Sequence, residues 1–311
     1  MKLIDVHRQF NTQGKCLDYL EAMRWPKGEV CCVACGSVKV SRITREKAGK
    51  NKQTRIYQCL ESECKHQFSA TAGTIFHDSH LPLDKWFLAI ALICEAKKGM
   101  SANQLKRHLG VNYRTAWHLA HRIREAMKED GLLTGVVEAD ETYMTARRPR
   151  KGKPYVKKDK RDVVLGMIER RGRLRLVPVK DAKMEIIGPA LQAHISPDAK
   201  TIYTDESSTY AIYLKQHFAA EHRTINHSRT YGIGDTHTNT IENAFSLLKR
   251  GVYGTFHKVS IKHLGRYCEE FSYRFNRRGE QAQMFNNTLK GLLRQKALPF
   301  KTLTASQISE F

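Results

Sequence analysis

Apolar residues in the first half of the chain recur at the spacing of amphipathic helices. Over residues 84–97 they fall every three or four positions, which predicts a helix packed on one face. A shorter helix is predicted over 102–109, with Ser101 as its N-cap and Gly110 at its end, and a longer basic helix over 113–128. A short helix, a glycine-containing turn and a longer basic helix are the layout of a helix-turn-helix, whose last helix enters the major groove of DNA.

Beyond residue 134 the pattern changes to the alternation and β-branched composition that are typical of strands. The predicted strands are 136–143, 162–168, 174–179, 201–204 and 223–227, and the predicted helices are 183–194, 207–218 and 240–250. Three strands followed by helix, strand, helix, strand, helix is the order of a ribonuclease-H-like α/β fold, a mixed sheet flanked by helices.

This order brings three acidic residues to one edge of the predicted sheet. Asp140 lies on the first strand, Asp205 at the end of the fourth strand and Glu242 on the last helix. Carboxylates suit a pair of Mg²⁺ ions, which can activate the attacking oxygen and stabilise the leaving oxygen of a phosphodiester. Two neighbours of Asp140 stay open as alternative ligands, Glu138 and Glu141.

The cysteines predict a second, structural metal centre. Five of the eight cysteines fall between residues 31 and 64. In a reducing compartment this clustering indicates a closed tetrahedral Zn²⁺ site, which a small polar unit would need in order to fold. The expected ligands are Cys32, Cys35, Cys59 and Cys64. Cys31 is an alternative to Cys32 as a ligand, and His66 is an alternative to Cys64.

Charge identifies the class of partner. The chain carries 53 Lys and Arg residues against 31 Asp and Glu residues, a formal net charge of +22, which favours polyanions and above all nucleic acid. The candidate DNA contacts are Arg114, His118 and Arg122 on the basic helix and Arg147, Arg148 and Lys151 in the basic segment 147–161. No signal peptide, membrane span or nucleotide-binding glycine motif is evident, so we expect a soluble, cytoplasmic protein without a nucleotide cofactor.

Several motifs in a fixed order resemble the zinc-ribbon-bearing DDE transposases of bacterial insertion sequences, which carry an ISXO2-like transposase domain. The motifs are the cysteine pairs, FSATAGTIFHDSHLPLDKW, VEADETY, YTDESSTY and HTNTIENAFSLLKRGVYGTFHKVS. The resemblance implies Mg²⁺-dependent cleavage at the ends of the element, with Mn²⁺ able to substitute, and transfer of the freed 3′-hydroxyl into target DNA. It assigns the catalytic acids to Asp140, Asp205 and Glu242, with Asn239 as an alternative third ligand, and a DNA contact to Lys249.

Four segments are predicted along the chain: a zinc ribbon with an N-terminal extension (1–76), a helix-turn-helix (77–132), the catalytic domain (133–278) and a C-terminal helical tail (279–311). We expect the tail to pack against the catalytic domain. Synapsis of two element ends on double-stranded DNA implies a homodimer or a higher oligomer. Two other functions fit the same features, a sequence-specific regulator with a vestigial catalytic fold and a structure-selective nuclease.

Overall fold

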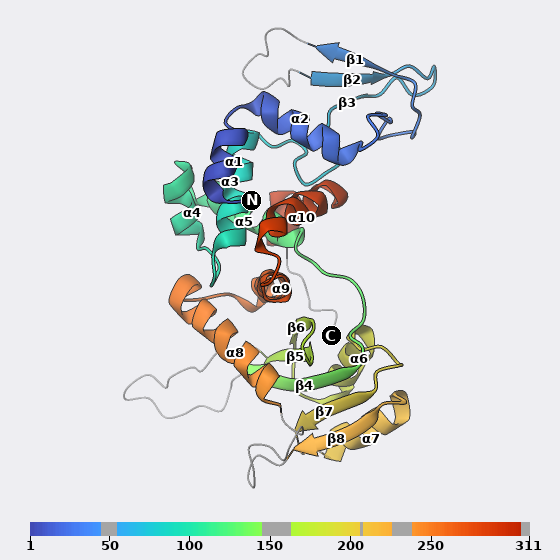
Figure 1. Cartoon of the computed structure of the whole chain (residues 1–311), viewed down its shortest axis with the longest axis vertical. Coiled ribbons are helices and arrows are strands. Elements are labelled where there is room, and N and C mark those ends of the chain that lie inside the picture. The colour runs from blue at the N-terminus through green and yellow to red at the C-terminus, as the bar shows by residue number, and fades with distance from the viewer. Residues whose placement is uncertain (45–54, 145–162, 206–207, 226–237, 306–311) are drawn as a thin grey trace. The chain divides into compact units, whose positions relative to one another are not determined.

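The computed structural model describes residues 1–44, 55–144, 163–205, 208–225 and 238–305 (Figure 1). The described chain divides into two compact units. The first joins Met1–Met127 to Glu280–Ala305, and the second contains Lys128–Gly279. Within the described ranges, none of the helices combines the length and apolar character needed to cross a membrane.

A mixed five-stranded sheet forms the centre of the second unit. Its strands are β4 (Val136–Tyr143), β5 (Val163–Glu169), β6 (Leu174–Val179), β7 (Thr201–Asp205) and β8 (Glu221–Ile225). Their order across the sheet is β6-β5-β4-β7-β8. β5 runs antiparallel to β4 and β6, whereas β7 is parallel to β4 and β8 to β7. This arrangement confirms the ribonuclease-H-like fold class.

Helices cover both faces of this sheet (Figure 1). They are α6 (Met184–His194), α7 (Ser208–His217), α8 (Asn239–Gly251) and α9 (Ile261–Asn276), and a single π-helical turn, η1 (Val252–Phe256), follows α8. Leu165 and Met167 of β5 pack with α6 and α7, while Val164 and Ile168 pack with α8 and α9. β5 is therefore apolar on both faces, as expected for a strand covered on each side.

Gly166 allows α8 to lie close to the sheet. It pairs across the ladder with Asp140 of β4. A Cβ atom added at Gly166 would lie 2.5 Å from Cε1 of Phe245 and 2.7 Å from Cδ1 of Ile241, both on α8. The missing side chain thus sets the distance between the helix and the strands beneath it.

We predict that Gly166→Ala lowers the free energy of unfolding of the second unit by about 1–3 kcal/mol, the usual cost of overpacking a core. Gly265→Ala is the matched control, because a Cβ there meets no atom within 4 Å and alanine favours a helix interior. Denaturant unfolding of both variants checks this. Equal stability of the two variants would contradict the proposed tight approach.

The first unit begins with two helices and a small antiparallel sheet. These elements are α1 (Leu3–Gln9), α2 (Gln13–Arg24), β1 (Val40–Thr44), β2 (Arg55–Cys59) and β3 (Gln67–Phe68), with strand order β1-β2-β3. Trp25 packs edge-on against Tyr57 at a centroid distance of 5.5 Å, and Tyr57 stacks on Phe68 at 5.6 Å. These three aromatic rings belong to the buried core of the ribbon, together with Cys32, Cys59, Ala70 and Ala72.

Three further helices, α3 (Leu83–Glu95), α4 (Ala102–Leu109) and α5 (Tyr113–Glu125), follow the ribbon. The Ser101 hydroxyl caps α4 by accepting the N–H of Gln104, and Gly110 ends that helix in the left-handed region at φ 60°. The Asn112 side chain caps α5 by accepting the N–H of Thr115 at 2.8 Å. The short turn between α4 and α5 thus has the predicted layout.

The C-terminal tail does not pack as we expected from the sequence. Its helices, α10 (Gln281–Arg294) and α11 (Phe300–Thr304), belong to the first unit, where α10 contacts α2, α3 and α5. Phe285 of α10 lies 5.7 Å from Phe87 and 6.1 Å from Phe10 between ring centroids. These apolar contacts place the tail in the N-terminal core rather than with the catalytic segment.

Candidate functional site

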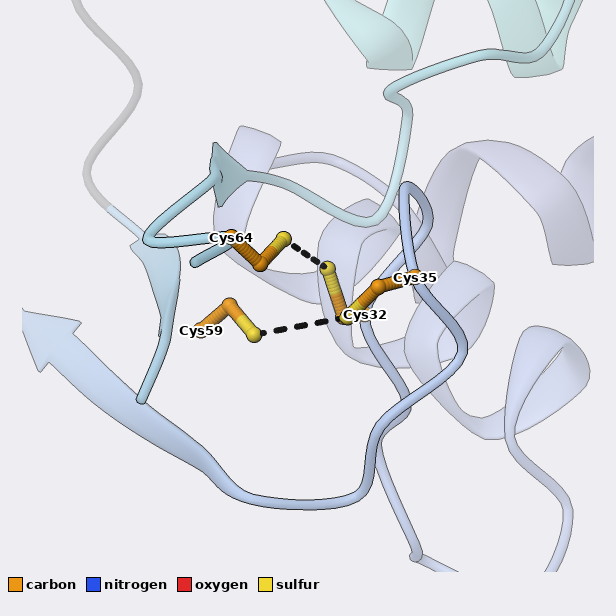
Figure 2. Close-up of side chains that lie close together, drawn as sticks. All are labelled: Cys32, Cys35, Cys59 and Cys64. Atoms are coloured by element: carbon orange, nitrogen blue, oxygen red, sulfur yellow. Dashed lines mark hydrogen bonds between the residues drawn. The ribbon is translucent and has the colours of Figure 1, made fainter. Parts of the chain in front are cut away.

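Four cysteine side chains converge in the ribbon (Figure 2). Cys32 and Cys35 come from the turn before β1, and Cys59 and Cys64 come from the end of β2 and the turn after it. The Sγ atoms of Cys32 and Cys64 lie 3.7 Å apart, those of Cys35 and Cys59 lie 3.6 Å apart, and all four lie within 4.8 Å of one another. Tetrahedral Zn–S bonds of about 2.3 Å require S···S distances of roughly 3.8 Å. The donor set therefore fits a closed structural Zn²⁺ site.

The compact group contains Cys32 and Cys64, and the two alternative ligands, Cys31 and His66, lie outside it. Cys31 lies outside the compact group and packs against the core of the ribbon. The His66 ring stacks on Phe68 with an interplanar angle of 6°, so Cys64 takes the fourth position. Burial opposes ionisation of the Cys32 thiol, but hydrogen bonds from the N–H groups of Cys35 and Ala34 and from neighbouring thiols outweigh it and lower its pKa to about 7. A thiolate, the form that binds zinc, is thus favoured at Cys32.

We predict that Cys35→Ser abolishes equimolar zinc binding and loosens β1 and β2, because a small ribbon depends on its metal to fold. Cys31→Ser is the control and should retain zinc. Metal analysis of the purified variants tests the loss of zinc, and hydrogen–deuterium exchange over residues 30–68 tests the loosening of the strands. Loss of zinc from both variants would show that the ligand register is different.

Two of the predicted catalytic acids lie at equivalent positions on adjacent parallel strands. Glu138 of β4 pairs with Tyr203 of β7, and Asp140 and Asp205 each lie two residues further along their strands. Because side chains two residues apart project from the same face, the two carboxylates share a face as well as an edge. Adjacent strands are about 4.8 Å apart, so these acids are neighbours.

Glu242 lies in the first turn of α8, which covers that same face. The N–H groups of Thr240 and Ile241 donate to the carboxylate of Glu138, which projects from β4 on the Asp140 side. The Thr238 hydroxyl donates to Glu242 Oε1 at 3.4 Å. Asn239, the alternative third ligand, lies three residues before Glu242 and therefore on a neighbouring part of the helix surface.

The charges of the neighbouring acids act on Asp140. Burial, together with the negative charges of Glu141, Asp205 and Glu242, raises the pKa of Asp140 from 3.8 to about 7, although the N–H of Glu141 donates to Asp140 Oδ1 at 2.8 Å and acts in the opposite direction. Among the described residues, the cysteines are the one compact group of metal-ligating side chains, so the acids are spaced more widely than the cysteines. A cation nearby would stabilise the ionised form of a carboxyl group in such surroundings.

We predict that the stability of the Mg²⁺-free protein falls as pH rises from about 4 to about 7, because a raised pKa makes the folded state favour the protonated Asp140. Asp140→Asn should remove this dependence and raise the free energy of unfolding at pH 8 by up to about 4 kcal/mol, since one pKa unit corresponds to about 1.4 kcal/mol. Denaturant unfolding of both proteins at pH 4.5 and pH 8 tests this. The same pH dependence of stability in both proteins would contradict a raised pKa of Asp140.

The two alternatives near Asp140 both have other partners. Glu138 is fully buried, and its oxygens accept hydrogen bonds from Arg170 and from the start of α8. Glu141 Oε2 accepts the Tyr210 hydroxyl at 2.7 Å, and burial raises its pKa. Asp140 therefore remains our candidate metal ligand on this strand.

The three candidate DNA contacts on α5 differ in exposure. Arg114 is exposed, and its guanidinium lies 4.2 Å from the centre of the Phe300 ring. His118 is half-buried and contacts the carbonyl oxygen of Leu298 at 3.2 Å, and burial lowers its pKa. The tail thus lies against two of the three residues, a contact between distant segments that no pattern in the sequence indicates.

Arg122 corrects the sequence interpretation. Its side chain is buried, lies 4.8 Å from the centre of the Trp86 ring and donates to the His77 carbonyl at 3.4 Å. Burial lowers its pKa to about 10. Arg122 therefore packs inside the helical core and does not present its charge to DNA. The other predicted basic contacts, Arg147, Arg148 and Lys151, lie outside the described residues, and Lys249 is half-buried on α8.

The sequence matches two family models. Residues 132–276 match the ISXO2-like transposase domain, and residues 11–67 match the transposase zinc-ribbon domain. A protein of Halobacterium salinarum, described as an uncharacterized protein in transposable element ISH50, is 27% identical over 293 residues, which cover 88% of this chain and 96% of that protein. The chain belongs to the DDE transposases that combine an ISXO2-like transposase domain with a zinc ribbon.

Two solved structures show distant similarity. The pre-cleavage Mos1 transpososome is 10% identical with a TM-score of 0.24, over 69% of this chain and 79% of that chain. The Mos1 strand transfer complex is 10% identical with a TM-score of 0.22, over 64% and 76% of the two chains. The family assignment rests on the sequence matches.

Proposed function

We propose that the protein is a DNA transposase that binds the terminal inverted repeats of an insertion sequence, cleaves its ends in the presence of Mg²⁺ and joins them to target DNA. The placement of Asp140 and Asp205 at equivalent positions on adjacent strands carries the proposal. Glu242, whose charge acts on Asp140, supplies the third acid. This set is the one that the family resemblance implies.

The carboxylates fit two Mg²⁺ ions by their chemistry, because hard divalent cations prefer oxygen ligands. Bound there by Asp140, Asp205 and Glu242, the ions would activate the attacking oxygen and stabilise the leaving oxygen of the phosphodiester. The N–H of Glu141 holds one oxygen of Asp140, and the Thr238 hydroxyl holds one oxygen of Glu242. These bonds orient the carboxylates before DNA arrives.

DNA binding follows from charge and from the exposed end of α5. The net charge of +22 favours the phosphate backbone, and Arg114 lies at the N-terminal end of the helix, where helix-turn-helix proteins contact base edges. His118, Arg147, Arg148, Lys151 and Lys249 complete the proposed set of DNA contacts. Because two element ends must be held together for joining, the active form is a homodimer or a higher oligomer.

We expect the purified protein to nick a labelled element end in Mg²⁺ or Mn²⁺ and to join the freed 3′-hydroxyl to a second duplex. Asp140→Ala should abolish both products while leaving DNA binding intact, because the acid holds the metal rather than the DNA. Asp198→Ala, an exposed acid in the same unit, is the control and should retain activity.

The products also separate the alternatives. Joined DNA supports a transposase, whereas cleavage of branched DNA without joining would indicate a structure-selective nuclease. A footprint on inverted repeats without nicking would indicate a regulator. An active Asp140→Ala protein would overturn the assignment of the site.

A further inference from the structure

Glu138 makes an unusual set of contacts for an acidic residue on a central strand. It is 0% exposed, and four hydrogen bonds from described residues reach its carboxylate. Arg170 Nε donates to Oε1 at 2.9 Å, and the Thr240 hydroxyl donates to the same oxygen at 2.9 Å. The N–H groups of Thr240 and Ile241 donate to Oε2 at 3.0 and 3.1 Å. A buried carboxylate is tolerated when it is satisfied in this way.

The start of α8 requires such an acceptor. The first N–H groups of a helix have no partner within the helix, and a side chain at the N-cap normally accepts one of them. The N-cap of α8, Thr238, makes no side-chain cap hydrogen bond. Glu138 supplies the missing acceptor from a strand about a hundred residues earlier, and its negative charge also interacts favourably with the helix dipole.

The surroundings of Glu138 keep the carboxylate in place. Arg170 follows β5, and its N–H donates to the Val136 carbonyl of β4 at 2.9 Å. Its guanidinium carbon lies 4.1 Å from the centre of the ring of Tyr203, the residue that pairs with Glu138 on β7. Contacts with β4 and β7 therefore hold Arg170 in place beside the Glu138 carboxylate that receives the end of α8.

Strand β4 thus links two candidate metal ligands: it carries Asp140 itself, and through Glu138 it binds the start of the helix that carries Glu242. Asp140 lies two residues after Glu138 on the same face of β4, and Glu242 lies one residue after Ile241 on α8. We infer that Glu138 is a positioning residue that holds the N-terminus of α8, and with it Glu242, at a fixed distance from Asp140. The inference rests on the proposed function for its catalytic consequence, but the contact itself exists without metal or DNA.

Glu138→Gln tests this inference, because it keeps the shape of the side chain while removing its charge and one acceptor. In the metal-free protein, the amides of residues 239–248 should exchange with deuterium at least about tenfold faster, while those of α9 are unchanged. The Mg²⁺ concentration for half-maximal end cleavage should rise about 10- to 100-fold, the usual effect of losing a group that orients metal ligands. Direct titration with Mn²⁺ should show the same shift in affinity without DNA.

The matched control is Glu185→Gln, which removes an exposed acid from the first turn of α6 and should change none of these readouts. Thr240→Val removes the hydroxyl bond but leaves both backbone bonds, so it should give a smaller shift in the same direction. This milder variant also keeps the test decisive if Glu138→Gln does not fold.

The outcomes separate the inference from the proposed function. A lower melting temperature with unchanged exchange at α8 and an unchanged metal midpoint would overturn the positioning role and leave the transposase intact. Wild-type protein that cleaves no DNA would overturn the proposed function. Even then, exchange and Mn²⁺ affinity report on the role of Glu138.

Discussion

The docking of the N-terminus of α8 onto β4 is the constraint on which the candidate active site depends. Helix ends carry unpartnered N–H groups, and a carboxylate buried on its own is unstable. The carboxylate of Glu138 accepts two of the N–H groups at the start of α8, so the helix end and the buried charge stabilise each other. Gly166 leaves room for α8 to approach, and the apolar side of the helix, including Ile241 and Phe245, packs into the space. The hydrogen bonds to Glu138 and the packing of the core thus favour the same position for α8.

Much of the fold was accessible from the sequence because it rests on short-range patterns. Alternation and β-branched residues predicted β4 and β7, and the order of strands and helices placed Asp140 and Asp205 at one edge of the sheet. The clustering of the cysteines predicted the four that converge. Contacts between distant segments could not be predicted in this way. The basic spacing of α5 made Arg122 look like a DNA contact, but its stacking on Trp86 depends on how α3 and α5 pack. The hydrogen bonds that the Glu138 carboxylate accepts likewise could not be predicted without knowing where α8 begins.

The surface of α5 that we propose for contact with DNA is narrower than its charge pattern suggested. Arg122 is turned into the core, and the tail lies against His118 and Arg114 through Leu298 and Phe300. Tyr113 and Arg114 at the start of the helix remain exposed. The basic residues of α4, Lys106, Arg107 and His108, are exposed as well. A basic helix in a sequence therefore indicates the kind of partner, while packing determines which of its residues can reach that partner.

The discontinuity of the first unit has a consequence for synthesis of the protein. Residues 280–305 complete the N-terminal core, with Phe285 against Phe87 and the carbonyl of Leu292 accepting the N–H of Ile75. During translation the ribbon and the following helices emerge first but lack these partners until residues 280–305 have left the ribosome. The described part of the acid-bearing unit, Lys128–Gly279, is one continuous stretch of chain and can fold earlier. A product terminated near residue 279 would retain Asp140, Asp205 and Glu242 yet expose an incomplete apolar core, which favours its degradation.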